Sequence, residues 1–256
     1  MRYWSADLHI HTVLSACADL SMGPIDIVKT ALAKGLDIIA VTDHNSAENA
    51  AAVIGAAKDT PLLVIPGMEV YTREEAHVIC LFRTLEDALS FQEVIYEHLP
   101  EGEYDGDLLG GQYVCDENEN ILGENRRFLA FPVDLPVHMV AGFVLDLDGI
   151  FYPAHIDRKS NSLLRALGFL PKNLPMTAVE IAQPLPEALQ QLGFLRTSPY
   201  TIVRSSDAHE ISQVGSKTTK LLMEAKSFDE LKMALAGENG RRAWPAEAET
   251  PCGNCR

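Results

Sequence analysis

The 256-residue sequence has few basic residues for its length, with 21 lysines and arginines against 36 aspartates and glutamates and a formal net charge of −15. This deficit argues against a basic surface that follows a nucleic-acid backbone, so we expect no long duplex nucleic acid as a partner. A small phosphorylated substrate is compatible, because divalent cations bound among acidic and imidazole ligands would reverse the charge locally.

Membrane and secretory features are also lacking. The sequence has no apolar run of roughly 18 residues, and its start, MRYWSADLHIHT, has no basic segment followed by an apolar one. The cysteines are odd in number and scattered, unlike a secreted disulfide framework; they are Cys17, Cys80, Cys115, Cys252 and Cys255. We therefore expect a cytoplasmic protein without a membrane partner.

The composition, 47% hydrophobic and 22% charged, is typical of a globular protein that buries a core. We predict one domain over residues 1–240 and a tail over residues 241–256. The tail carries Cys252 and Cys255 as a CxxC pair, for which a redox role, half of a metal site and no function all stay open.

Short apolar runs alternate with amphipathic stretches of helical length, which predicts parallel strands covered by helices. The segment near residues 102–125 is rich in Gly, Asp, Glu and Asn, and we interpret it as a small insertion that a hairpin would fit. The expected fold is α/β, barrel or barrel-like. Predicted strands cover residues 7–11, 36–42, 62–65, 77–82, 150–155, 176–181 and 200–205, and predicted helices 24–34, 49–58, 85–97, a segment within 130–149, and 186–191.

Six of the eight histidines lie at or next to the carboxyl end of a predicted strand. Residues two apart in a strand point to the same side, so His9 and His11 can direct both imidazoles at one metal ion. Asp207 and His209 repeat this spacing. Any one of these histidines alone could be a buried or capping residue, but the set indicates metal binding. The six are His9, His11, His44, His77, His155 and His209.

A carboxylate, Glu69, follows a Pro-Gly pair after another apolar run. A carboxylate can bridge two cations, and imidazole nitrogen combined with carboxylate oxygen suits zinc, manganese or iron better than calcium.

Six motifs occur in one order and resemble the PHP (polymerase and histidinol phosphatase) superfamily of phosphoesterases. The resemblance implies a distorted (β/α)7 TIM-like barrel with an insertion near residues 102–125, and two or three divalent metal ions (Zn, Mn or Fe). The motifs are ADLHIHT (6–12), GLDIIAVTDHN (35–45), PGMEV (66–70), AHVICLF (76–82), YPAHIDR (152–158) and SSDAHEISQVG (205–215).

The resemblance also implies a ligand set. Glu69 would bridge the first and second metal ions. Cys17 stands in the loop where the family usually has His or Asp; a thiolate there would favour zinc or iron, with a small buried cysteine as the alternative. The implied ligands are His9, His11, Glu69 and Asp207 for the first ion, Glu69, His77 and His155 for the second, and His44, His209 and Cys17 for the third.

By the same resemblance, a metal-bridging hydroxide would be the nucleophile, with Glu69, Asp207 and His209 as catalytic residues. If the third site holds no metal, His209 or His44 would instead donate a proton to the leaving group. Arg158 would grip the substrate phosphate, with a surface salt bridge as its alternative. Asp7 and Asp43 would orient imidazoles through hydrogen bonds.

The expected function is a metal-dependent phosphoesterase, a hydrolase acting on a small phosphomonoester or nucleotide. One alternative is a PHP-fold metal-binding module without catalysis. Another is a metal-dependent amidohydrolase, which a bridging lysine would support; the sequence has Glu69 at that position.

Overall fold

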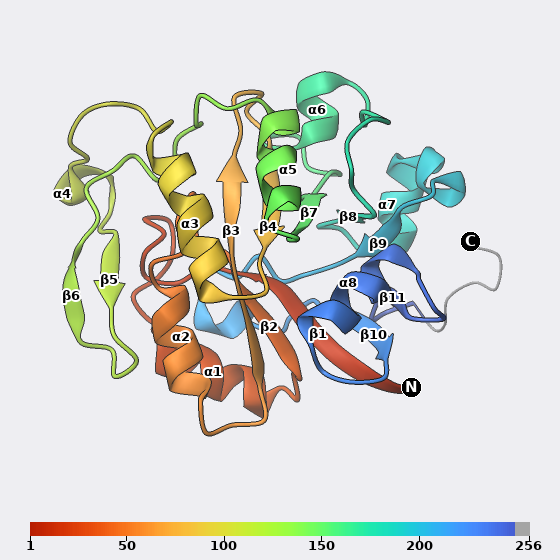
Figure 1. Cartoon of the computed structure of the whole chain (residues 1–256), viewed down its shortest axis with the longest axis horizontal. Coiled ribbons are helices and arrows are strands. Elements are labelled where there is room, and N and C mark those ends of the chain that lie inside the picture. Colours follow the sequence, from red (N-terminus) through yellow and green to blue (C-terminus); the bar gives the residue numbers. More distant parts are fainter. Residues whose placement is uncertain (249–256) are drawn as a thin grey trace.

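A curled seven-stranded sheet lies at the centre of the molecule (Figure 1). The computed structural model describes residues 1–248. The sheet has the order β11-β10-β1-β2-β3-β4-β7. Its strands are β1 (Arg2–Ile10), β2 (Ile38–Val41), β3 (Leu63–Tyr71), β4 (His77–Leu81), β7 (Ile150–Pro153), β10 (Thr219–Met223) and β11 (Arg242–Pro245).

The direction of the strands departs from a regular (β/α)7 barrel. The pairs β1–β2 and β2–β3 are parallel, whereas β3–β4, β4–β7, β1–β10 and β10–β11 are antiparallel. Residues 72–76 join β3 to β4, a connection too short for a crossover helix, so β4 turns back along β3. The α/β class is confirmed, and the sheet is a curled half-barrel.

A separate parallel pair lies between the two edges of this sheet. It consists of β8 (Ala178–Glu180) and β9 (Thr201–Val203). β8 contacts β7 and β9 contacts β11, and the backbone N–H of Ile156 donates to the carbonyl of Glu180 over 2.9 Å. The edges of the half-barrel therefore approach each other across this pair without a continuous ladder.

Eight α-helices surround the strands in the described residues. The longer ones are α1 (Pro24–Ala33), α2 (Ala50–Ala57), α3 (Leu85–Tyr96), α5 (Val137–Asp146) and α8 (Phe228–Ala236), and the shorter ones α4 (Gly106–Leu109), α6 (Leu163–Leu167) and α7 (Leu185–Gln191). Short 3-10 turns cover Gly193–Thr197 and Ile211–Gln213. Pro24 occupies the first turn of α1, where its missing N–H costs no hydrogen bond.

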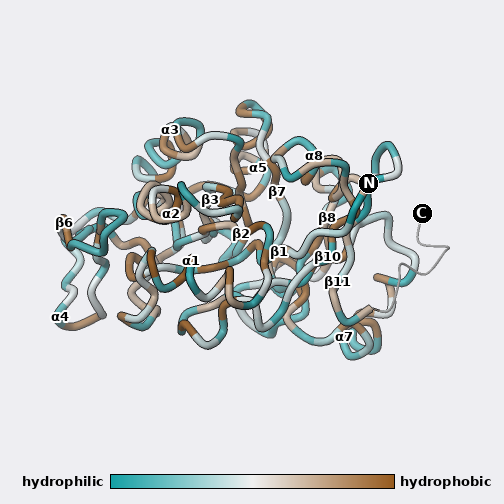
Figure 2. The backbone as a smooth tube through the Cα atoms, turned by 90° about the horizontal axis from the view of Figure 1, so that it is seen from below, coloured by the Kyte–Doolittle hydropathy of each residue, from teal (hydrophilic) through white to brown (hydrophobic). Residues whose placement is uncertain are grey.

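The central strands are buried on both faces, which explains their nearly continuous apolar sequences (Figure 2). In β2, Ile39 and Val41 pack in the cluster that includes the apolar faces of α1, α2, α3 and α5. Ile38 and Ala40 pack in a second cluster with α8. Successive side chains of a strand point to opposite faces, so a four-residue strand contributes to both cores.

The segment near residues 102–125 forms α4 and a two-stranded hairpin of its own, β5 (Tyr113–Cys115) and β6 (Ile121–Glu124), which projects to one side of the molecule (Figure 1). At the other end of the chain, β11 continues the sheet past the predicted boundary at residue 240. The CxxC pair, Cys252 and Cys255, lies outside the described residues. None of the helices in residues 1–248 has the length and apolar character needed to cross a bilayer.

Candidate metal centre

The predicted ligands meet at the end of the sheet where the parallel strands finish. His9 lies in β1, Glu69 lies in β3, and His44 follows β2. Isolated bridges pair His44 with Glu69, and Ile10 with Ala208, so the segment between β9 and β10 joins the same edge. The carboxyl ends of parallel strands are adjacent, which is why residues distant in sequence converge here.

His77 reaches the cluster differently from its prediction. It opens β4 instead of ending it, because β4 is antiparallel to β3 and begins opposite Tyr71, at the end of β3. His155 follows β7, which is antiparallel to β4, so its end also lies at this edge. The predicted location was therefore right, and the predicted strand end was wrong for His77.

Glu69 lies at the centre of five imidazoles. Its side chain is 1% exposed. The Oε1 atom lies 3.3 Å from Nε2 of His9, 2.9 Å from Nδ1 of His77 and 3.0 Å from Nε2 of His155, and Oε2 lies 3.0 Å from Nδ1 of His44 and 3.5 Å from Nε2 of His11. Asp207 completes the group, with Oδ1 at 3.3 Å from Nε2 of both His9 and His11.

Several of these atoms are close without pairing with one another, which fits a shared cation. Nδ1 of His44 and Nδ1 of His77 are buried close to Glu69, but neither forms a hydrogen bond of normal geometry within residues 1–248. Nε2 of His9 and Nε2 of His11 lie 3.1 Å apart, and a neutral imidazole has only one lone pair to direct at a donor or a metal. The donor atoms thus converge on common space, as ligands of a divalent metal ion do.

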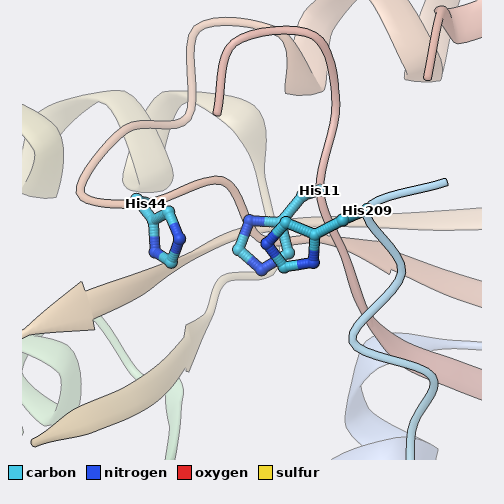
Figure 3. Close-up of side chains that lie close together, drawn as sticks. All are labelled: His11, His44 and His209. Atoms are coloured by element: carbon cyan, nitrogen blue, oxygen red, sulfur yellow. The ribbon is translucent and has the colours of Figure 1, made fainter. Parts of the chain in front are cut away.

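Among the described residues, three sets of side chains have possible metal-ligand atoms within 4.8 Å of one another. They are His9, His11, Glu69 and Asp207; His44, Glu69 and His77; and His11, His44 and His209. Figure 3 shows the imidazoles of the third group close together, with the ring of His209 stacked on that of His11 at a centroid distance of 4.1 Å.

The cluster holds its carboxylates in the charged form that binds metal. Burial opposes ionisation of Glu69, but the neighbouring charges of His77 and His9 hold the pKa of this carboxyl well below its usual range. Burial also opposes ionisation of Asp207, but His9 and His11 lower the pKa of this carboxyl. Both groups are thus ready to act as ligands.

Glu180, at the end of β8, contacts the cluster but was not among the predicted residues. Its Oε1 and Oε2 lie 3.1 and 3.3 Å from Nδ1 of His9, and Oε1 also accepts from the backbone N–H of His155 over 3.2 Å. This buried carboxylate fixes the His9 ring so that Nε2 faces Glu69 and Asp207. An ionisable residue closing a predicted apolar strand was the available signal.

Asp43 orients an imidazole through an intermediate. Its carboxylate accepts hydrogen bonds from Thr12 N and Oγ1 and from Ser15 Oγ at 2.7 to 2.8 Å. Ser15 Oγ in turn lies 3.0 Å from Nδ1 of His11. The ring of His11 is therefore held by Ser15, and Asp43 holds Ser15.

Asp7 differs from its prediction, because its hydrogen bonds go to backbone N–H groups of Ser206 (2.9 Å) and Gly215 (2.8 Å) instead of to an imidazole. Burial raises the pKa of Asp7 to about 6. Its contacts tie β1 to the segment that carries Asp207.

Arg158 lies beside the cluster. Its side chain is 41% exposed, and Nη2 lies 2.6 Å from Oδ2 of Asp207. The backbone of Asp207 (φ 55) and that of His155 (φ 29) are in the left-handed region, a strained conformation that a functional site often retains.

Cys17 lies at the rim and is exposed, unlike the buried structural cysteine that was its alternative. Although the residue is exposed, its thiol is partly screened from water, which opposes ionisation. Hydrogen bonds with His209 and His44 nevertheless lower the pKa of this thiol to about 6. The thiol is therefore next to two imidazoles of the predicted third site.

Residues 7–123 match the model of the PHP domain family. The uncharacterized protein YqxK of Bacillus subtilis is 23% identical over 276 residues, which cover 93% of this chain and 63% of that protein. The chain thus spans less than two thirds of this relative.

Two kinds of solved structure share the fold. The lesion-specific endonuclease EndoQ of Pyrococcus furiosus is 18% identical with a TM-score of 0.73, covering 94% of this chain and 58% of that one. A protein of Bifidobacterium adolescentis that is described as a putative metal-dependent phosphoesterase is 16% identical, with a TM-score of 0.53. The match covers 80% of this chain and 87% of that one. These likenesses show that the chain shares the fold of both proteins.

A further structure corrects the expected partners. This is the structure of Endonuclease Q in complex with a 27-mer duplex substrate that has an abasic lesion at the active site. It is 18% identical to this chain, with a TM-score of 0.73. The match covers 94% of this chain and 58% of the endonuclease chain. The exclusion of duplex nucleic acid was wrong, because −15 is a sum over the whole chain. Binding depends on the local field, to which Arg158 and any bound cations contribute positive charge.

Proposed function

This chain carries a PHP domain, and on that premise we propose that it is a metal-dependent phosphoesterase whose substrates include phosphodiesters of duplex DNA. The observation that supports this most strongly is the buried carboxylate of Glu69, which faces five imidazoles. Nδ1 of His44 and Nδ1 of His77 lie close to this carboxylate without a hydrogen bond of normal geometry in the described part of the chain. A set of nitrogen and oxygen donors of this kind suits zinc, manganese or iron.

Two divalent cations would have Glu69 as a common ligand in this proposal. His9, His11 and Asp207 would complete the first site, and His77 and His155 would complete the second. Cations held there would supply Lewis acidity for phosphoester hydrolysis.

The protein groups around these sites hold the ligands and receive the substrate. Glu180 keeps Nε2 of His9 directed into the cluster, and Ser15 does the same for His11. Arg158 uses Nη2 on Asp207, and the rest of its exposed guanidinium has donors for a phosphate oxygen. Its planar fork suits this task better than a lysine ammonium.

The choice of DNA as a substrate rests on the shared fold and on Arg158. Endonuclease Q, whose solved complex has a duplex with an abasic lesion at the active site, shares its fold with 94% of this chain. Arg158 is an exposed cation that contacts Asp207, a ligand of the first site, and an arginine next to bound cations suits a backbone phosphate.

The proposal is tested by measuring metal content together with cleavage. The purified chain is assayed on a bis-aryl phosphate and on a duplex with an abasic site, before and after chelation and after adding back zinc, manganese or iron. We expect bound metal and chelator-sensitive cleavage. Glu69→Gln should abolish both, and Glu93→Gln on the exposed side of α3 should change neither.

Each alternative outcome has a distinct meaning. Bound metal without cleavage of either substrate would make the chain a metal-binding module. Cleavage of the aryl ester but not of the duplex would remove DNA from the proposal. A chain that binds no metal, with its fold intact by circular dichroism, would refute the proposal as a whole.

A further inference from the structure

The segment that follows β6 carries two adjacent arginines, Arg126 and Arg127, and both are exposed. In the described part of the chain, neither guanidinium forms an ion pair or donates a hydrogen bond, whereas those of Arg73, Arg83 and Arg204 each pair with a carboxylate. The chain has 36 acidic residues against 21 basic ones. Two neighbouring cations that find no carboxylate in such a chain are available to an anion from outside.

Both arginines line a cavity of about 470 Å³ between the hairpin and the residues before α2. Two carboxylates, Glu48 and Glu124, also line it, but each has another contact. Oε2 of Glu48 accepts a hydrogen bond from Nδ2 of Asn125 over 3.0 Å. The side chain of Glu124 packs against Gly106 of α4, where an added Cβ would collide with it. The arginines are therefore the groups of this cavity that still lack a polar partner of opposite charge.

A network of side chains holds Arg127 in place beside α3 (Figure 1). Its Cζ atom lies 4.3 Å from the centroid of the Tyr96 ring. The hydroxyl of Tyr96 accepts from Nδ2 of Asn125 over 3.0 Å and lies 2.7 Å from Oγ of Ser46. Asn125 is 5% exposed, and its Oδ1 accepts from the backbone N–H of Arg127 over 2.9 Å. A guanidinium already stacked on a ring loses less conformational freedom when it binds an anion.

The same cavity lies close to the metal centre along the chain. Glu48 follows His44 by four residues, so their Cα atoms are at most about 14 Å apart. Nδ2 of Asn45 donates to the carbonyls of Leu129 and Phe131 over 2.8 and 2.9 Å, which holds the segment after the arginines against the loop of His44. One strand of duplex DNA rises about 3.4 Å per nucleotide, so about 14 Å corresponds to about four nucleotides.

We propose that Arg126 and Arg127 bind backbone phosphates of duplex DNA about four nucleotides or fewer from the phosphodiester at the metal centre. This inference rests on the proposed function, because it assumes that the metal centre cleaves DNA. The planar fork of a guanidinium fits a phosphate group. Such contacts fix the position of a duplex on a protein without reading its sequence. They also give a chain of net charge −15 a local cationic surface for a polyanion.

The test compares a large and a minimal substrate in the double variant Arg126→Ala/Arg127→Ala. For a duplex with an abasic site, we expect KM to rise by about 10-fold or more, because charged hydrogen bonds to phosphate are lost. The slope of log KM against log salt concentration should fall by about 1 to 2, since each lost phosphate contact releases fewer counterions. Cleavage of a bis-aryl phosphate and metal content should stay at the parent values, because neither involves the cavity.

Arg196→Ala/Arg242→Ala is the matched control, because it removes the same charge at two exposed positions outside the insertion and should leave the salt slope unchanged. Arg126→Lys/Arg127→Lys keeps the charge without the planar fork, so it should restore the salt slope and only part of the affinity. Duplexes shortened from one side of the lesion locate the contact. The effect of the double alanine variant should disappear once fewer than about four nucleotides remain on the side that reaches the cavity.

Failure of this inference differs from failure of the proposed function. If the parent cleaves the duplex and the double alanine variant, folded by circular dichroism, keeps its KM and salt slope, the arginines do not bind the duplex and the proposed function is intact. An equal loss of bis-aryl phosphate cleavage in the variant would also overturn the inference, because it would show damage to the metal centre. If the parent cleaves no duplex, the DNA substrate and this inference fail together.

Discussion

The two ends of the metal cluster differ in burial and in donor chemistry. At one end, Glu69, His77 and His155 are buried and offer only nitrogen and oxygen. At the other, His209 is 25% exposed and Cys17 adds sulfur. The first environment favours a tightly enclosed ion, and the second an ion that solvent and substrate can reach.

The elements that supply each end explain this difference. The enclosed end is built on strands β3 and β4 and on the segment directly after β7, and these strands are held by ladder hydrogen bonds. The open end is built on the loop after β1 and on the segment between β9 and β10. Rigid strands position the shared carboxylate, and loops position the residues at the open end.

Glu69→Gln tests whether the two proposed metal sites depend on one carboxylate. Since both oxygens face imidazoles, we expect loss of metal at both of these sites and a fall in kcat of at least about 10³-fold. Metal content by elemental analysis and single-turnover cleavage measure this. Full retention of metal in the variant would mean that Glu69 is not a shared ligand.

Glu180→Gln should separate the two proposed metal sites. The amide cannot hold His9 as the carboxylate does, so metal affinity at the first site should fall by about 10- to 100-fold. Metal at the second proposed site, with His77 and His155, should be retained better, because the ring that Glu180 contacts is that of His9. Glu187→Gln, on the exposed surface of α7, is the control. Equal weakening of both sites would show general loss of structure in place of a positioning role.

Arg158→Ala tests the exposed cation beside the cluster without removing a ligand. Loss of a charged donor to phosphate should raise KM for the duplex by about 10-fold or more, with metal content unchanged. Arg158→Lys should restore only part of the affinity, because an ammonium lacks the planar fork. The exposed neighbour Lys159 serves as the control through Lys159→Ala. If the variant lost metal with no change in KM, Arg158 would be a partner of Asp207 alone.

The sequence predicted the cluster better than it predicted the sheet. His9, Glu69 and Asp207 lie together as expected, because strand-end residues of an α/β fold meet at one edge whatever the exact strand count. Strand direction was harder, because the five-residue link before His77 forms a hairpin that an apolar run alone does not reveal.

Residues that act through another residue were the least predictable. Glu180 lies in a three-residue strand outside the main sheet, and its contact with His9 spans 171 positions of sequence. Asp7 was expected to hydrogen-bond to an imidazole, but its carboxylate instead accepts hydrogen bonds from two backbone N–H groups. Motif spacing identifies which side chains share an edge, but hydrogen-bond partners depend on how distant loops fold back.

Ser15→Ala should have the smallest effect, and it probes the junction between the two ends. Ser15 Oγ contacts His11 Nδ1 and donates to Asp43, so the variant frees the His11 ring and removes one of three hydrogen bonds to Asp43. A neutral hydrogen bond contributes about 1 kcal/mol, so we expect metal affinity to fall by about 5-fold. Calorimetric titration with zinc measures this, with Ser21→Ala in the same loop as the control. An unchanged zinc affinity would show that Ser15 does not hold the His11 ring in its metal-binding orientation.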